Sequence, residues 1–334
     1  MSPQTPSGVD GRHGTDHYIP PTTGIIAVLP RTWVPYAELM RLYPVGFAIV
    51  GLFWAMGLSF AASITQPLIS FKDCIGIVSP LYLWLFFTRC FLIAFNDTAD
   101  YQIDREVSRT RFRPVARGAI TPGNAYRFCA TGILVSTLLL KLTPVDSHRY
   151  ALIATTIMLL YPFCKRFTYF PPVVMGLGYA MSVFQCCAAL GVDVLGSESE
   201  YRLSAVCLAG VEVVIPVFMD VIYAQQDRRD DARIGAKSLA ILMGDQAKAY
   251  LWALGLLLEI FLVTIGVEND YSPFYYVISC GGSFLVLSTT LLVVDFRVAE
   301  SCFAWFLRFV VFTTGSIASG FMAEYLLRLW LFGH

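Results

Sequence analysis

Charged side chains are scarce in this 334-residue sequence. Only 14% of the residues are Asp, Glu, Lys or Arg, whereas 56% are hydrophobic, and the mean hydropathy is +0.62. A soluble domain usually carries about 25% charged and about 45–50% apolar residues, so this chain has more apolar surface than a water-soluble fold can cover. The formal net charge is zero, which argues against a general attraction to nucleic acid. The composition favours an integral membrane protein over one or two soluble domains.

The sequence also lacks the usual patterns of metal, redox and nucleotide sites. Its nine cysteines contain no CxxC pair, and none of its four histidines lies near an acidic motif. We therefore expect buried free thiols and assign no chemistry to the histidines. The segment Gly235-Ala236-Lys237-Ser238 resembles the end of a P-loop, but the upstream glycine of GxxxxGK[ST] is absent, so we expect no nucleotide site.

The first 24 residues have a different composition from the rest of the chain. They are rich in Pro, Gly, Ser and Thr and contain no hydrophobic stretch, so they cannot bury enough apolar surface to fold. They lack the apolar core of a secretory signal, and the acids Asp10 and Asp16 are atypical of a mitochondrial presequence. We expect residues 1–24 to form a flexible cytosolic tail and residues 25–334 to form a single transmembrane domain.

Nine apolar runs have roughly the length of a transmembrane helix, which needs about 20 residues to cross the hydrocarbon core. They cover approximately residues 43–63, 76–95, 123–142, 150–164, 172–193, 203–224, 247–267, 273–294 and 304–331. Pro216 lies inside the sixth run, where it predicts a kink. The sequence therefore predicts an all-α integral membrane protein with nine transmembrane helices.

The basic residues are distributed unevenly between the two sides of such a bundle. Nine spans place the N-terminus and every second loop, including residues 96–122 and 225–246, on one side, and most Lys and Arg residues fall there. The opposite side carries Lys72, Lys141, Arg149, Arg202 and, near the C-terminus, Arg328. By the positive-inside rule, the basic side faces the cytosol.

The first acidic motif is the segment NDTADYQID at the end of the second run. Residues three and four apart share a helix face, so Asn96, Asp100 and Asp104 are stacked, with Asp97 beside them. Carboxylates crowded at a membrane boundary repel one another, and a bound cation relieves that repulsion. Oxygen ligands of this kind suit Mg²⁺, which proteins commonly hold with one or two carboxylates plus substrate phosphates.

The second acidic motif follows the sixth run. Helical spacing aligns Asp220, Tyr223, Asp227 and Asp231 on one stripe, with Asp230 adjacent. Two facing stripes of this kind could hold Mg²⁺ ions around one diphosphate. Nearby cations that could take the remaining phosphate charge are Arg113, Arg117, Lys165, Arg166 and Lys237.

A single acidic run beside a membrane is usually a solvated loop. Here the acids lie at the ends of apolar runs, they recur twice at helical spacing, and basic residues follow each motif. Ionisable clusters at membrane depth are functional by default. The pattern therefore favours a metal and diphosphate site.

With these motifs, the sequence resembles the UbiA-type intramembrane prenyltransferase superfamily over nearly the whole chain after the tail. The resemblance rests on NDTADYQID, RTRFRPVARGAIT, YPFCKRFTYFP and DVIYAQQDRRDDARIGAKS. It implies nine transmembrane helices around a central cavity, with both acidic motifs in a cytosolic cap. The family commonly has Pro-Gln where this sequence has Pro171-Pro172, which leaves the acceptor side of the site open.

The resemblance also implies roles for particular residues. The implied metal ligands are Asn96, Asp97, Asp100 and Asp104 in the first motif and Asp227 and Asp231 in the second. The candidate catalytic residues are Asp100, Asp104, Asp227, Asp231 and Arg166. The candidates for binding the Mg²⁺–diphosphate are Arg41, Asn96, Arg113, Lys165, Tyr223 and Lys237.

Within the superfamily, the sequence is most similar to fungal meroterpenoid transferases, which attach a farnesyl or geranylgeranyl chain to a phenolic acid or pyrone in endoplasmic-reticulum membranes. The expected partners are an isoprenoid diphosphate, a small aromatic or pyrone acceptor and the lipid bilayer, with no nucleic acid. The alternatives are a terpene cyclase on the same scaffold, a 4-hydroxybenzoate polyprenyltransferase of quinone biosynthesis, and a transporter. The donor chain length, the acceptor, the regiochemistry and the oligomeric state stay open.

Overall fold

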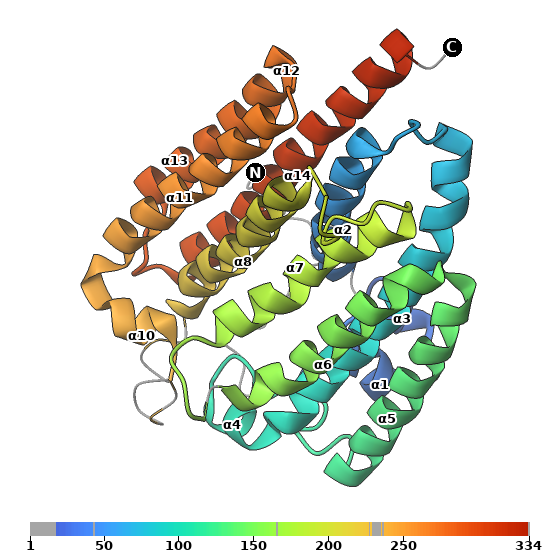
Figure 1. The fold of residues 1–334 in the computed structure, drawn as a ribbon. Helices are drawn as coiled ribbons and strands as arrows, with labels where there is room; N and C mark the ends of the chain where they lie inside the picture. Colours follow the sequence, from blue (N-terminus) through green and yellow to red (C-terminus); the bar gives the residue numbers. More distant parts are fainter. Residues whose placement is uncertain are drawn as a thin grey trace, which may run out of the picture.

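A computed structural model of the chain describes residues 18–42, 44–164, 166–226, 228, 235 and 237–332. Over these ranges the regular structure is entirely helical (Figure 1). The α-helices are α1 (Val34–Leu39), α2 (Pro44–Ile64), α3 (Phe71–Ala99), α4 (Tyr101–Glu106), α5 (Pro122–Leu139), α6 (His148–Cys164), α7 (Pro171–Ala189), α8 (Arg202–Ala224), α10 (Leu239–Met243), α11 (Ala247–Glu268), α12 (Pro273–Tyr275), α13 (Gly282–Val293) and α14 (Ala299–Phe332). Short helical segments are η1 (Ile25–Val28), η2 (Leu140–Leu142), η3 (Val145–Ser147), η4 (Gly244–Gln246) and the π-helical η5 (Tyr276–Gly281).

Seven helical segments in the described part of the chain are long and apolar enough to cross a membrane. They contain α3, α5, α7, α8, α11, α13 and α14. The prediction of an all-α membrane protein is confirmed, and these seven match seven of the nine predicted runs. The other two runs correspond to α2, whose described apolar stretch is Ile49–Ile64, and to the 17-residue α6. As a helix, α2 has 21 residues, whereas α6 is shorter than the about 20 residues that cross a bilayer without tilt or thinning.

The centre of the bundle is formed by α2, α7, α8 and α14. The most extensive helix contacts join α7 to α8, α14 to α2, and α6 to α7. Aromatic side chains fill the interior: the rings of Phe218 on α8 and Phe309 on α14 stack with centroids 4.9 Å apart. At Gly176 on α7, an added Cβ would lie only 2.7 Å from the Cα of Val213 on α8. A small residue at this position therefore permits the close approach of α7 and α8, as is common in membrane helix packing.

The outer faces of the bundle expose apolar side chains. Leu134 and Leu138 on α5, Ile260 on α11 and Leu285 and Leu292 on α13 are all exposed. Soluble monomers rarely display apolar surface of this extent. The exposed side chains are those expected to contact lipid.

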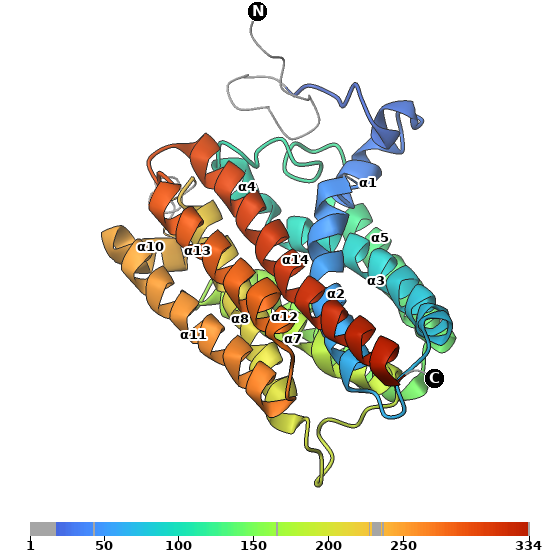
Figure 2. The ribbon, with the colours of Figure 1, turned by 90° about the horizontal axis from the view of Figure 1, so that it is seen from above.

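The first acidic motif lies at one end of the bundle. Figure 2 shows α1 and α4 together at the upper end of the view, while α14 runs down to the C-terminus at the other end. A small second core fastens α1 and the loop after α4 to α3 and α5. It consists of Leu39, Ala94, Val115, Ile120, Ala125 and Cys129.

Residues 1–17 of the predicted N-terminal tail lie outside the described residues. The described part of that tail begins at Tyr18, whose hydroxyl donates a hydrogen bond of 2.8 Å to Oε1 of Glu38 on α1. The segment before α2 is thus connected to the same end of the bundle as the acidic motif.

Candidate active site

The first acidic motif crosses a break between two helices. α3 ends at Ala99, Asp100 adopts a non-helical conformation (φ −93°, ψ 4°), and α4 begins at Tyr101. The hydrogen-bond spacing nevertheless continues: the N–H of Asp100 donates to the carbonyl of Asn96 (3.0 Å), and the N–H of Asp104 donates to the carbonyl of Asp100 (2.9 Å). The predicted stacking of Asn96, Asp100 and Asp104 is therefore compatible with the backbone, although the helix is interrupted.

All three carboxylates of this motif are buried. Asp97 and Asp100 are each 2% exposed, and Asp104 is 5% exposed. Burying a carboxylate costs several kcal/mol unless it is paired and hydrogen-bonded. The partners of these acids therefore decide what the site can do.

Two arginines neutralise Asp97 and Asp104. Nη1 of Arg113 lies 3.1 Å from Oδ1 of Asp97 and 2.9 Å from Oδ2 of Asp104, and Nη2 of Arg41 lies 2.7 Å from Oδ1 of Asp97. Burial lowers the pKa of Arg113, but Asp97 and Asp104 raise it by more, so the net pKa lies above the ordinary arginine value. Arg113 is therefore firmly cationic and links the two acids.

Arg41 occupies an unusual backbone position. Its N–H donates to the carbonyl of Glu38 (3.0 Å), and the N–H of Leu42 donates to the carbonyl of Ala37 (3.2 Å). This is the Schellman pattern that ends α1, and it gives Arg41 a φ of 47°. Glycine is usual at this position, because a Cβ in the left-handed region costs roughly 1–2 kcal/mol. The strained residue is the one whose side chain reaches Asp97.

We expect replacement of Arg41 by glycine to give a more stable protein than replacement by alanine. Both variants lose the ion pair with Asp97, but only glycine removes the Cβ from the left-handed position, a difference of about 1 kcal/mol. Thermal unfolding of the two variants in the same detergent measures this difference. Equal midpoints would show that the turn is not strained at Arg41.

Tyr223, at the C-terminal end of α8, lies near the first motif. The guanidinium carbon of Arg109, in the loop after α4, lies 4.9 Å from the centroid of the Tyr223 ring. The Tyr223 ring also packs against Phe306 of α14 at a centroid distance of 4.9 Å. The loop after α4 therefore contacts both the first motif, through Arg113, and Tyr223 at the start of the second.

The second motif itself can be described only in part. Asp227 and Asp231, the predicted metal ligands and catalytic residues of this motif, and its neighbour Asp230 lie outside the described residues. Asp220 lies on α8, half-buried. How the two motifs face each other therefore stays a prediction.

Two further candidate cations, Arg166 and Lys237, lie at different positions. Nη2 of Arg166 donates to the carbonyl of Ala99 (3.1 Å), which places Arg166 beside the first motif. Nζ of Lys237 donates to the carbonyl of Phe167 (3.2 Å) and lies 5.7 Å from the centroid of the Tyr169 ring, so Lys237 contacts the loop after α6. Lys165 lies outside the described residues.

The donor atoms of the first motif fit a hard cation shared with a phosphate. Among the residues that the structure describes, no three His, Cys, Asp or Glu side chains form a metal-binding group by themselves. Oδ1 of Asn96 is buried and has no hydrogen-bond partner within that part of the chain. Oxygen donors that are too few for an all-protein cage suit Mg²⁺, which completes its shell with water and phosphate oxygens.

Sequence reasoning missed four buried charged residues of the described chain, namely Glu38, Arg89, Glu212 and Glu324. Arg89 lies on α3 seven residues before Asn96 and is 6% exposed, Glu38 is buried on α1, and Glu212 on α8 accepts a hydrogen bond of 2.7 Å from Ser182. Arg89 and Glu212 interrupt apolar runs, and an ionisable residue inside such a run is a signal that could have identified them. Glu38 precedes the first run and carries no such signal.

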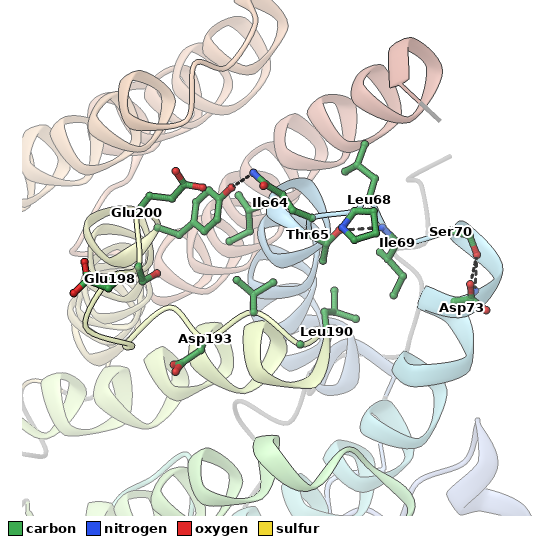
Figure 3. A pocket seen from close by; sticks show the side chains of 16 residues that line it. Ile64, Thr65, Leu68, Ile69, Ser70, Asp73, Leu190, Asp193, Glu198 and Glu200 are labelled. Atoms are coloured by element: carbon green, nitrogen blue, oxygen red, sulfur yellow. Dashed lines mark hydrogen bonds between the residues drawn. The ribbon is translucent and has the colours of Figure 1, made fainter. Parts of the chain in front are cut away.

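A hollow of about 720 Å³ lies at the other end of the bundle (Figure 3). It is formed by the loops after α2 and α7 and carries Asp73, Asp193, Glu198 and Glu200. Asp73 and Asp97 are 24 positions apart on α3, which at 1.5 Å per residue is roughly 36 Å. This hollow is therefore separate from the first acidic motif.

Comparison with known proteins agrees with this geometry. The UbiA prenyltransferase family matches residues 45–314. The prenyltransferase stbC of Stachybotrys bisbyi is 30% identical over 309 residues, 91% of each chain, and the DMOA farnesyltransferase nvfB of Aspergillus novofumigatus is 31% identical over 78% of this chain and 81% of its own. A UbiA homolog from Archaeoglobus fulgidus, solved with GPP and Mg²⁺, has a TM-score of 0.63 at 16% identity and covers 88% of this chain and 98% of its own. The chain belongs to the UbiA prenyltransferase family.

Proposed function

We propose that this chain catalyses the Mg²⁺-dependent transfer of an isoprenoid chain from its diphosphate to a carbon of an aromatic or pyrone acceptor. The observation that carries the proposal is the buried stripe of Asp97, Asp100 and Asp104 at the end of an apolar helix, balanced by Arg41 and Arg113. A set of acids and arginines at this depth suits a ligand that carries both metal ions and phosphate.

The proposed donor is farnesyl diphosphate or, as the second choice, geranylgeranyl diphosphate. The name of the relative nvfB, a DMOA farnesyltransferase, supports the farnesyl chain, and the GPP and Mg²⁺ of the Archaeoglobus homolog support an isoprenoid diphosphate with its metal. The fungal prenyltransferases among the relatives support a meroterpenoid product of secondary metabolism.

The residues of this chain would act mainly by electrostatic stabilisation. When bound, Mg²⁺ would neutralise the negative charge that grows on the departing diphosphate. The first motif would hold the metal through its carboxylates and Asn96, and Asp227 and Asp231 would do so from the second motif. Arg41, Arg113 and Arg166 present planar guanidinium groups that can bind phosphate oxygens bidentately, with Lys165, Tyr223 and Lys237 as further contacts.

The apolar interior would then protect the allylic cation. Side chains such as Phe218 and Phe309 are fully buried and offer no nucleophile, and exclusion of water prevents premature quenching of a reactive intermediate. An electron-rich ring carbon of the acceptor attacks the cation, and the ring carbon then loses its proton. Asp227 is the candidate to orient or deprotonate the acceptor.

We further propose the topology that the positive-inside rule predicts. α2 and α6 would cross the membrane together with the seven longer helical segments, giving nine spans around a central cavity. The acidic motifs would lie in a cap on the cytosolic side of the endoplasmic reticulum. Residues 25–334 would form a single transmembrane domain, an assignment supported by the family match over residues 45–314.

The test is a reaction with purified protein in detergent or nanodiscs. Farnesyl or geranylgeranyl diphosphate, Mg²⁺ and a panel of phenolic acids and pyrones are combined, and products are identified by mass spectrometry. We expect a prenylated acceptor that disappears when EDTA is added, with unchanged activity in the control variant Asp193→Asn at the far end of the bundle. A hydrocarbon or terpenol formed without acceptor would indicate a cyclase instead, and no consumption of either diphosphate would contradict the proposal.

A further inference from the structure

A buried ion pair joins α1 to the loop after α4 and engages Arg117, one of the cations that the sequence predicts near the phosphate. Nη2 of Arg117 lies 2.6 Å from Oε2 of Glu38, and the two side chains are only 13% and 5% exposed. Nη1 of Arg117 donates to the carbonyl of Phe112 (2.7 Å). On the other side of the pair, Tyr18 donates to Oε1 of Glu38 (2.8 Å), and its ring centroid lies 3.7 Å from the guanidinium carbon of Arg117. Arg117 is thus engaged through both terminal nitrogens and one face.

Each member of this pair lies one turn of backbone away from an arginine that binds Asp97. The carbonyl of Glu38 accepts the N–H of Arg41 (3.0 Å), and the N–H of Arg117 donates to the carbonyl of Arg113 (2.9 Å). The side chains of Arg41 and Arg113 then meet at the same atom, Oδ1 of Asp97, at 2.7 Å and 3.1 Å. The contacts form a closed ring that runs Glu38, Arg41, Asp97, Arg113, Arg117 and back to Glu38.

The ring contains two features that stability alone does not explain. A buried ion pair can often be replaced by well-packed apolar side chains without loss of stability, because desolvation offsets the attraction between the charges. Arg41 also holds the left-handed conformation that glycine would adopt without strain. Both features are explained if this closed ring of contacts holds the guanidinium groups of Arg41 and Arg113 in a particular arrangement.

We propose that Glu38 and Arg117 are positioning residues for the diphosphate site. Their ion pair holds the two backbone turns together and thereby sets the spacing of Arg41 and Arg113 around Asp97. A diphosphate carries two linked phosphate groups, and two guanidinium groups at a set spacing can bind both of them. This inference rests on the proposed function, and it adds residues that touch neither metal nor substrate.

Tyr18 extends the same arrangement to the segment before α1. Its hydroxyl satisfies the second oxygen of Glu38, and its ring covers the guanidinium group of Arg117. Shielding the pair from water strengthens the attraction between Glu38 and Arg117. The segment that begins at Tyr18 therefore contributes to the site, although it contains none of the motif residues.

The experiment compares Glu38→Gln, Arg117→Gln and the double variant with the wild type and with Glu300→Gln, a matched change at an exposed position. The KM for the isoprenoid diphosphate and kcat are measured, together with the apparent Kd for Mg²⁺–pyrophosphate from thermal shifts, which needs no acceptor. We expect each single variant to raise KM and Kd about 10- to 100-fold, as misplacement of binding groups by about 1 Å can do, with a smaller change in kcat. The KM and Kd of the double variant should be no higher than those of either single variant, because the pair acts as a unit.

Unchanged KM and Kd in the single variants, or effects that multiply in the double variant, would overturn the positioning role. If the charge-removing variants fail to fold, Tyr18→Phe is tested in their place, since it removes only one hydroxyl. A rise in Kd smaller than that expected for the charge-removing variants would support the inference, and an unchanged Kd would oppose it. A wild-type protein that neither turns over an isoprenoid diphosphate nor binds Mg²⁺–pyrophosphate would instead contradict the proposed function. The two failures are therefore distinguishable.

Discussion

Replacement of Asp97 by asparagine is expected to remove nearly all prenyl transfer while leaving the protein folded. Arg41 and Arg113 both contact Oδ1 of Asp97, and the side chain is 2% exposed, so the substitution deletes a charge at the centre of the arginine cluster. Losing one group that stabilises developing charge typically lowers kcat about 10²- to 10³-fold. Stability should change much less, because asparagine has nearly the same shape and Arg113 keeps its contact with Asp104.

Initial rates with saturating donor and acceptor, together with thermal unfolding, measure this effect. Asp193→Asn at the far end of the bundle is the matched control, because it makes the same chemical change roughly the length of α3 away. Activity of the Asp97→Asn variant within tenfold of the wild type would show that Asp97 has a structural role only.

Replacement of Arg113 by methionine is expected to destabilise the metal-free protein, and Mg²⁺ is expected to reverse much of that loss. Arg113 is the cation that links Asp97 and Asp104, so its removal leaves two buried acids with less compensation. Removing one partner of a buried pair costs about 3 kcal/mol or more. A divalent cation bound to the same acids would restore the balance of charge and stabilise the folded state by mass action.

The measurement is the unfolding midpoint of Arg113→Met and wild type, each in EDTA and in Mg²⁺. The rise on adding Mg²⁺ should be larger for the variant than for the wild type. Arg113→Lys keeps the charge but loses the planar fork, so it should be less destabilised while still turning over poorly. Equal Mg²⁺ shifts in wild type and Arg113→Met would mean that the metal does not bind where Arg113 acts.

The positions of most helices could be predicted from the apolar runs because membrane helices are apolar on all sides. The predicted run 203–224 corresponds to α8 at Arg202–Ala224, and the run 247–267 corresponds to α11 at Ala247–Glu268. Agreement is poorer where a helix continues beyond the apolar stretch. α3 begins at Phe71 rather than at residue 76, because Ser70 caps the helix by accepting the N–H of Asp73 (3.2 Å). The first turn of α3 contains polar residues and so falls outside the apolar run from which the helix was predicted.

Only those parts of the candidate site that depend on the spacing of residues within one helix could be predicted from the residue pattern. The interval of four residues between Asn96, Asp100 and Asp104 is a property of one helix turn, so the sequence reveals it. The approach of Arg41 to Asp97 spans 56 positions, and only the family resemblance made Arg41 a candidate. The pairing of Glu38 with Arg117 spans 79 positions, and no periodicity indicates it. Contacts of that kind arise from tertiary packing of α1 and the loop after α4 on α3 and α5.

The end of α3 at Ala99 has an electrostatic consequence of its own. A helix carries roughly half a negative charge at its C-terminus, from carbonyl groups that lack intrahelical partners. Asn96, Asp97 and Asp100 lie in that last turn, so their side chains add to a potential that is already negative. Arg166 donates to the carbonyl of Ala99 itself, and Arg41 reaches Asp97 in the same turn. Arg166 thus caps the C-terminal end of α3 while Arg41 and Arg113 bind the acids beside it, and the end of α3 and the cation-binding centre form a single electrostatic unit.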